Sequence, residues 1–366
     1  MPLEQTTQNK DKEALESLQI SKIIPPILIG LGVVILLMIY QLDTEQFKLI
    51  PVTLHTFIWL GLAGFLYFLR HMFYSWRLYV MTTGDFTWWK SVELITIWEF
   101  ASAVSPTNIG GSAVAIFLLA QEKISSARTV SIVLYSMVLD TIIFVLFLPL
   151  LYLFLGPLIV RPGLENGAEM NGYVLTFWVV LGIMFTYGSF FAYGLFLKPV
   201  HFKRILLWIS KIRILKRFQQ ELRKTAIDVV NTSRDISNQS ISFHLKCMAG
   251  TTGAWAFRFL ALNCIIIALV PSVSMGFTDQ ILIFSRAMSM HAITTFSPTP
   301  GGAGVAELLF GGFFSDYIYL GISSVIALVW RLITYYPYLL SGAIVIPVWI
   351  REVVIRRKRE KLANKN

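Results

Sequence analysis

Long apolar runs separated by short polar connections form the main pattern of the sequence. Residues 131–156 and 173–197, for example, are almost wholly apolar. Each is long enough to cross a bilayer as a helix, which takes about 20 residues. Eight such segments can be recognised, at about residues 23–40, 54–76, 93–120, 130–156, 173–197, 247–270, 280–320 and 322–349. The pattern predicts an all-α, polytopic membrane protein.

Two of these segments are interrupted near their middle by proline and paired glycines. The first reads WEFASAVSPTNIGG over residues 98–111, and the second reads HAITTFSPTPGG over residues 291–302. Proline removes a helix hydrogen bond and clashes with the preceding turn, and glycine permits a tight reversal. We therefore expect two re-entrant or broken helix hairpins beside six crossing helices. The residues expected to break the helices are Pro106, Gly110, Gly111, Pro298, Pro300, Gly301 and Gly302.

The distribution of basic residues favours this topology. If every segment crossed once, the basic loop 198–246 and the basic tail 351–366 would lie on opposite sides of the membrane, although short basic connections normally stay cytoplasmic. With two hairpins, 26 of the 31 Lys and Arg residues lie on one side, when Arg70 and Arg77 are counted with a surface connection. The sequence thus predicts a cell (inner) membrane protein with both termini in the cytoplasm.

The two interrupted segments resemble each other and indicate an inverted repeat. SPTNIGGSAVAIFLL aligns with SPTPGGAGVAELLF, and each half of the chain reads as two crossings, a hairpin and a crossing. Such repeats are common in secondary transporters. Irregular backbone at membrane depth has to be buried in protein or line a wet cavity, and helix N-termini there attract anions. The side chains expected to add hydroxyl and amide groups to this cavity are Ser105, Thr107, Asn108, Ser297 and Thr299.

Ionisable residues inside the expected spans are the candidate substrate-binding groups. They are Glu99, Asp140, Arg258, Arg286, His291, Glu307 and Arg331. Charges in a bilayer are costly, so they are paired or functional. One interpretation is mutual salt bridging that stabilises the fold. The other is a lipid head-group site, in which Arg258 and Arg331 bind a phosphate while the acids orient them or meet an amine. For His291 we favour packing or hydrogen bonding over proton transfer.

Other site classes find little support in the sequence. Cys247 and Cys264 fall in one expected helix and are interpreted as small apolar residues rather than a disulfide or metal pair. There is no zinc-binding, phosphate-loop or nucleophile-elbow motif. We therefore expect no metal, no cofactor and no enzymatic activity. The basic residues that produce the net charge of +10 lie between apolar spans, so membrane orientation explains them and no nucleic acid partner is expected.

Two motifs carry a family resemblance. SPTPGGAGVAE at residues 297–307, followed by WRLITYY at 330–336, resembles the C-terminal signature of the flippase-like family, also called the lysylphosphatidylglycerol synthase transmembrane region family. WEFASAVSPTNIGG, with Asp140 further on, is similar to its N-terminal motif. The resemblance implies a membrane domain that moves lipids between leaflets, without the synthase domain. The positions that match the family pattern are Pro106, Gly110, Gly111, Asp140, Pro300, Gly301, Gly302, Gly304, Glu307 and Arg331.

These observations predict one transmembrane flippase-like domain over residues 23–350, between cytoplasmic tails 1–22 and 351–366. The basic loop 198–246 suits an amphipathic helix on an anionic leaflet or a cytoplasmic helical hairpin. The leading hypothesis is that the protein translocates or binds an anionic or aminoacylated phospholipid, or a lipid-linked substrate, with bilayer phospholipids as its partners. The alternatives are an ion-coupled or small-anion transporter, an intramembrane transferase, and a membrane scaffold for a lipid-modifying enzyme.

Overall fold

The computed structural model describes residues 51–105, 108–122, 124–163, 172–209, 236–296, 305–318 and 320–363, with a few isolated positions between 227 and 233. Across these ranges the chain forms helices and turns and no strand, which confirms the all-α class. Five helical segments of the described chain are long and apolar enough to cross a membrane. They are Leu54–Met81, Arg128–Ile159, Gly172–Leu197, Ile241–Leu269 and Val325–Arg356. The first expected crossing, 23–40, lies outside the described residues.

The long uninterrupted helices match the apolar segments. They are α4 (Leu54–Met81), α7 (Ser126–Leu155, followed by a 3₁₀ turn, Gly156–Ile159), α8 (Gly172–Ala192, followed by a π-helical turn, Tyr193–Leu197) and α11 (Ile241–Leu269). Three of these helices begin at hydroxyl caps, because the side chains of Thr53, Ser125 and Ser240 each accept a backbone hydrogen bond from the first turn. Short α9 (Pro199–Ile209) follows α8 directly.

Both interrupted segments form two helices. The first gives α5 (Trp88–Val104) and α6 (Asn108–Gln121), and the second gives α12 (Phe277–Thr294) and α13 (Val305–Phe313). Most of the expected break residues, namely Pro106, Pro298, Pro300, Gly301 and Gly302, lie outside the described residues, as do Thr107, Ser297 and Thr299. Gly110 lies in α6, in a stretch whose side chains are not described.

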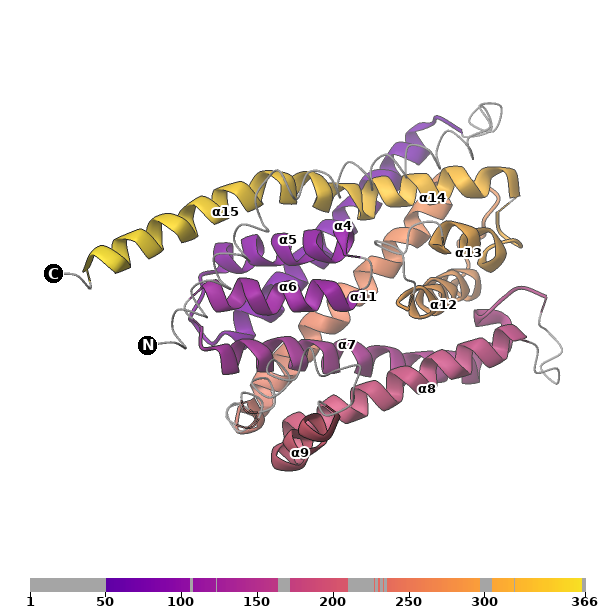
Figure 1. The fold of residues 1–366 in the computed structure, drawn as a ribbon. Coiled ribbons are helices and arrows are strands. Elements are labelled where there is room, and N and C mark those ends of the chain that lie inside the picture. Colours follow the sequence, from indigo (N-terminus) through magenta and orange to yellow (C-terminus); the bar gives the residue numbers. More distant parts are fainter. Residues whose placement is uncertain are drawn as a thin grey trace.

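The helices α5 and α6 fold back on each other (Figure 1). Lys90, at the start of α5, forms an ion pair of 3.2 Å with Glu122, which directly follows α6. Gly111 lies inside α6, where an added Cβ would collide with Ser102 of α5. This glycine therefore permits the close approach of the two helices rather than the reversal that the sequence predicted for it.

The helices α12 and α13 also bring the chain back to where it began. The Tyr317 hydroxyl, just after α13, donates a 2.9 Å hydrogen bond to Asp279 in the first turn of α12. Arg286 of α12 pairs with Asp316 at 2.5 Å. Each interrupted segment therefore starts and finishes at the same end of the molecule.

The two hairpin-like pairs open at different ends, and α4, α7 and α11 connect these ends (Figure 1). We call the first the basic end; it holds Asp85, Lys90, Glu122, Arg128 and Arg356, which are joined by ion pairs. We call the other the opposite end; it holds Leu158, Asp279, Arg286 and Asp316.

The helix α4 packs along α11 through the centre of the protein, and both glycines of their contact are on α11. A Cβ on Gly253 would overlap the ring of Phe73, and one on Gly250 would touch Arg77. Small residues at such contacts let membrane helices approach closely. This pair positions the side chains that are described below as the candidate site.

The last crossing consists of α14 (Leu320–Thr334) and α15 (Tyr336–Ala363). The Tyr335 amide still donates to the Arg331 carbonyl at 2.9 Å, so the two helices are nearly continuous. The basic tail expected from residue 351 is helical to Ala363. Its Arg, Lys and Glu residues are good helix formers, which explains the extension.

A buried carboxylate holds α15 at the basic end. Glu122 accepts hydrogen bonds from Trp349 Nε1 at 2.6 Å and Arg356 Nη1 at 2.8 Å, and it lies near Lys90. Burial by itself raises the pKa of Glu122, but the hydrogen bonds from Arg356 and Trp349 and the charge of Lys90 outweigh burial and lower the pKa. Glu122 therefore stabilises the fold in its ionised form.

We predict that Glu122→Gln lowers stability at neutral pH by about 1–3 kcal/mol, because buried donors lose a charged acceptor. The stabilising effect of the carboxylate is present above its ordinary pKa near ~4.3 and is lost as the pH falls through the lower folded value. Thermal unfolding in detergent should therefore show the variant and the wild type converging below about pH 4. Glu352→Gln, at a side chain that is 61% exposed, is the control. Equal melting temperatures at pH 7 for all three proteins would contradict the prediction.

Candidate functional site

Two arginines on α4 anchor the buried polar groups of the interior. Arg70 and Arg77 lie two helical turns apart, on one face of an otherwise apolar helix, and are 2% and 5% exposed. Charges in such surroundings require counter-charges and hydrogen bonds. The structure supplies one carboxylate for each arginine.

The first pair is Arg70 with Glu99 of α5. The Arg70 Nη2 lies 2.9 and 3.0 Å from the two carboxylate oxygens, and Nη1 donates to the Tyr338 hydroxyl at 2.7 Å. The guanidinium also lies over the rings of Tyr67, Tyr74 and Tyr338. This pair ties α4, α5 and α15 together near the middle of the protein.

The second pair is Arg77 with Asp140 of α7. One oxygen, Asp140 Oδ1, accepts from Arg77 Nη1 at 2.6 Å and from Trp255 Nε1 at 3.0 Å. Arg77 also donates to Thr251 at 3.3 Å. The second oxygen, Oδ2, has no partner among the described residues, and the Asp140 side chain is 29% exposed. This carboxylate is therefore fixed on one side and open on the other.

Arg258 lies beside Trp255, the residue that donates a hydrogen bond to Asp140. Its guanidinium is 5.5 Å from the indole centroid, and it forms no ion pair within the described part of the chain. It lines a small cavity with His291 and Trp330, of about 10 Å³, which is room for about one water molecule. His291 packs against Trp255 with ring centroids 4.9 Å apart, as the packing interpretation predicted. The charge of Arg258 is close enough to act on Glu99.

For two of the acids, the expected salt bridging within the predicted set needs correction. Glu99 and Asp140 pair with Arg70 and Arg77, which the sequence had placed at the membrane surface. The apolar segment was predicted to end at residue 76, before Arg77, whereas α4 continues to Met81. The buried positions of Arg70 and Arg77 could have been predicted from their seven-residue spacing, which places both side chains on one face of a helix.

The other candidates lie apart from this centre. Arg286, fully buried at the opposite end, donates to the Leu158 carbonyl at 2.8 Å and pairs with Asp316, so it stabilises the α12–α13 return. Arg331 packs over Trp330 and Tyr335. Ser105 caps the C-terminus of α5. The side chain of Glu307 lies outside the described residues.

Tyr335 connects the last crossing with the end of α5. Its hydroxyl donates to the Ala103 carbonyl at 3.1 Å. This contact places Arg331, one turn before Tyr335, near the C-terminal end of α5. Cys247 and Cys264 are free and buried in α11.

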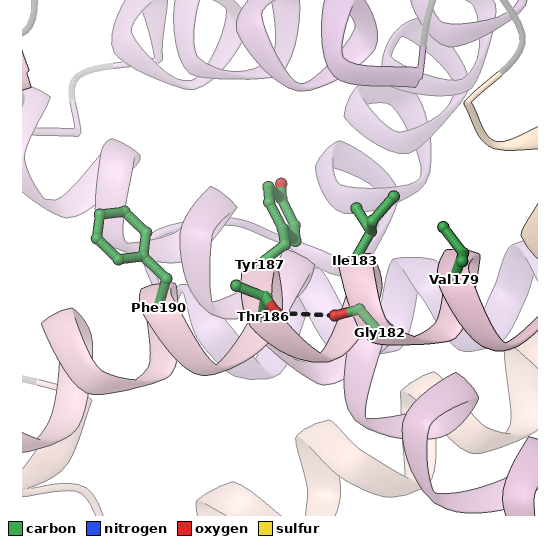
Figure 2. A pocket seen from close by; sticks show the side chains of 6 residues that line it. All are labelled: Val179, Gly182, Ile183, Thr186, Tyr187 and Phe190. Carbon is green, nitrogen blue, oxygen red and sulfur yellow. Dashed lines mark hydrogen bonds between the residues drawn. The ribbon is translucent and has the colours of Figure 1, made fainter.

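An apolar groove runs along α8. It has a volume of about 620 Å³ and is lined by Val179, Gly182, Ile183, Thr186, Tyr187 and Phe190. Figure 2 shows these residues on one side of the helix. The Thr186 hydroxyl donates a hydrogen bond of 2.8 Å to the Gly182 carbonyl. Ile183 is 48% exposed, so the groove opens sideways from the helix bundle. Sequence reasoning missed it, because it depends on the packing of α8 beside α7.

Tyr187 connects the groove with the buried charges. Its hydroxyl lies 3.6 Å from the sulfur of Met137 on α7, and the charge of Asp140, one turn further along α7, acts on it. Gly188 directly contacts Thr141, so α8 lies close against α7 at this level. The groove therefore lies beside the part of α7 that carries Asp140.

Comparison with known families agrees with this architecture. The family described as the lysylphosphatidylglycerol synthase TM region matches residues 25–342. The chain belongs to this family. A UPF0104 membrane protein of Archaeoglobus fulgidus is similar, with 21% identity over 269 residues, which cover 70% of this chain and 75% of that protein. No solved structure matches. The match extends over both interrupted segments and most of the last crossing of this lysylphosphatidylglycerol synthase TM region protein.

We predict that Arg70→Met destabilises this family member by about 3–5 kcal/mol, because it removes the ion-pair partner of Glu99, a carboxylate whose side chain is only 22% exposed. Adding Glu99→Gln should restore most of the loss, since the buried charge is then removed. Thermal unfolding of both variants in detergent measures the difference. Arg128→Met breaks a pair with Asp85 whose side chains are 33% and 40% exposed, and serves as the control. If the double variant were no more stable than Arg70→Met, the unpaired charge of Glu99 would not be the cause of the lost stability.

Proposed function

We propose that this lysylphosphatidylglycerol synthase TM region protein binds phospholipids of the cell membrane and moves them between leaflets. The observation that carries the proposal is the apolar groove on α8, which opens sideways and is lined by Tyr187, whose hydroxyl contacts Met137 one turn before Asp140 on α7. A phospholipid likewise combines an apolar acyl chain, which suits the groove, with a charged head group, which suits the ion pair of Arg77 and Asp140.

The shape of the interior favours a lipid over a water-soluble substrate. The cavity beside Arg258 has room for about one water molecule, whereas the groove has a volume of about 620 Å³. A lateral opening lets an acyl chain stay in the hydrocarbon while only the head group passes through the protein. This arrangement lowers the cost of moving a charged head group across the membrane.

The charges beside the groove suit a head group that carries both signs. Asp140 Oδ2 is free to accept a hydrogen bond from an ammonium group. Arg258, whose guanidinium lies 5.5 Å from the Trp255 ring centroid, forms no ion pair within the described residues and can bind a phosphate. The interpretation therefore supports the anionic or aminoacylated phospholipids expected from the sequence.

The two fold-back helix pairs supply a candidate moving part. We interpret α5–α6 and α12–α13 as re-entrant hairpins of an inverted repeat, with α4 and α11 as equivalent helices. Equivalent elements packed at a pseudo-symmetric centre let a protein alternate between two related conformations. The basic residues of the end that holds Lys90, Arg128 and Arg356 favour a cytoplasmic position for that end and for the C-terminus.

Gly182→Phe tests the groove directly. A Cβ on Gly182 meets nothing within 4 Å, so the ring fills the groove without disturbing the helix. We expect liposomes with wild-type protein to transfer fluorescent phosphatidylglycerol to the outer leaflet, measured by bleaching with an impermeant reductant. We expect the variant to approach the rate of empty liposomes. Gly61→Phe, on α4 and also in open space, is the matched control. Wild-type liposomes that bleach no faster than empty ones, across several lipids, would refute the proposed function.

Asp140→Asn tests the head-group interpretation. The amide oxygen can still accept from Arg77 and Trp255, but the negative charge is lost. We expect transfer of amine-bearing phospholipids to fall roughly tenfold or more, since a hydrogen bond to a charged group is worth about 1.5–3 kcal/mol. Lipids without an amine should be affected less. An equal loss for both lipid classes would assign Asp140 a structural role only.

A further inference from the structure

The junction of α8 and α9 falls at the end of a candidate membrane span, which is where lipid head groups are expected. The candidate span Gly172–Leu197 ends one residue before Lys198, and α9 begins at Pro199. Figure 1 shows α9 at the end of α8 and turned out of line with it. A helix in this position lies near the membrane interface rather than across the bilayer.

Among the described side chains of α9, Phe202 is the one that is buried against the rest of the protein. Phe202 is 1% exposed and packs against Phe190 of α8, with ring centroids 4.9 Å apart. The same contact cluster includes Val130 and Leu134 of α7. Phe190 also lines the groove, so the groove ends directly against α9.

The remainder of α9 combines exposed apolar and basic side chains. Trp208 is 69% exposed and Val200 is 51% exposed. Arg204 and Lys198 are also exposed, and Lys203 is partly exposed. None of these three cations forms an ion pair within the described residues. Apolar and cationic groups on one interfacial helix are complementary to an anionic membrane surface.

The end of the groove at Phe190 lies in the half of the span that is nearer to α9. Phe190 is seven residues before Leu197, which is about 10 Å along the helix at 1.5 Å per residue. The midpoint of the span Gly172–Leu197 falls between Ile183 and Tyr187. An acyl chain whose head group is at α9 therefore enters the groove beside Phe190 and reaches the middle of the bilayer within the groove.

We propose that the junction of α9 and the groove is a docking site for one anionic phospholipid. Its phosphate is held by Lys198, Lys203 and Arg204, and one acyl chain occupies the groove. Docking requires no contact with Asp140 or Arg258. The inference deepens the proposed function, because it assigns the lipid class and the place where that lipid binds before transfer.

Native mass spectrometry of the full-length protein tests the site by counting retained lipid. Phosphatidylglycerol and phosphatidylcholine with the same acyl chains are titrated against wild type, Arg204→Glu and the double variant Lys203→Glu/Arg204→Glu. We expect the preference for phosphatidylglycerol to fall about fivefold for each basic residue lost near the head group. Raising the ionic strength from about 0.1 M to about 1 M should have a similar effect, since screening shortens the Debye length to about 3 Å.

Two further variants make the outcome decisive. Arg359→Glu changes the same charge on exposed α15, away from α9, and should leave the preference unchanged. Gly182→Phe should weaken retention of both lipids, because it fills the acyl-chain position. An unchanged preference in the double variant, or an equal loss in Arg359→Glu, would overturn the docking site.

The fluorescent transfer assay on the same proteins separates the two proposals. Retention that depends on Arg204, together with no transfer by wild type, would leave the docking site standing and refute translocation. Transfer that is blocked by Gly182→Phe, together with a phosphatidylglycerol preference independent of Arg204, would refute the docking site and leave translocation standing.

Discussion

The cost of placing charge inside a membrane protein controls the arrangement of the central helices. Arg70 and Arg77 are carried into the interior by α4, a helix that is long and apolar enough to cross a membrane. Each needs a carboxylate and further acceptors or aromatic faces, and these come from α5, α7 and α15. The relative positions of these helices are therefore fixed by two ion pairs as well as by apolar packing, which by itself discriminates weakly between helix faces in a lipid environment.

The same two pairs differ in a way that separates a structural role from a functional one. Glu99 has both oxygens bound to Arg70. Asp140 has both donors on Oδ1, and its Oδ2 has no partner among the described residues. A carboxylate that is bound through both oxygens stabilises the fold, whereas an oxygen without a partner can accept a hydrogen bond from a ligand. The open oxygen of Asp140, the groove on α8 and the position of α9 at the Phe190 end of the groove are the three features on which the proposed lipid path depends.

The sequence predicted several features because they follow from local composition. Helix length and apolar content gave the all-α membrane class, and the Pro-Gly interruptions placed the breaks that separate α5 from α6 and α12 from α13. The paired ends of these helices, at Lys90–Glu122 and Asp279–Tyr317, agree with the fold-back that the positions of the basic residues required. His291 also packs among aromatic rings as expected.

The sequence by itself determined which segments are helical and membrane-spanning and where they break, because hydrophobicity and backbone restrictions act over neighbouring residues. Only the tertiary structure decided which charges meet, since Arg77 and Asp140 are 63 positions apart and their contact depends on how α4 and α7 pack. It also decided that Arg286 serves the opposite end and that one face of α8 stays open beside α7. These outcomes depend on the angles and depths at which whole helices pack, and no local pattern encodes those quantities.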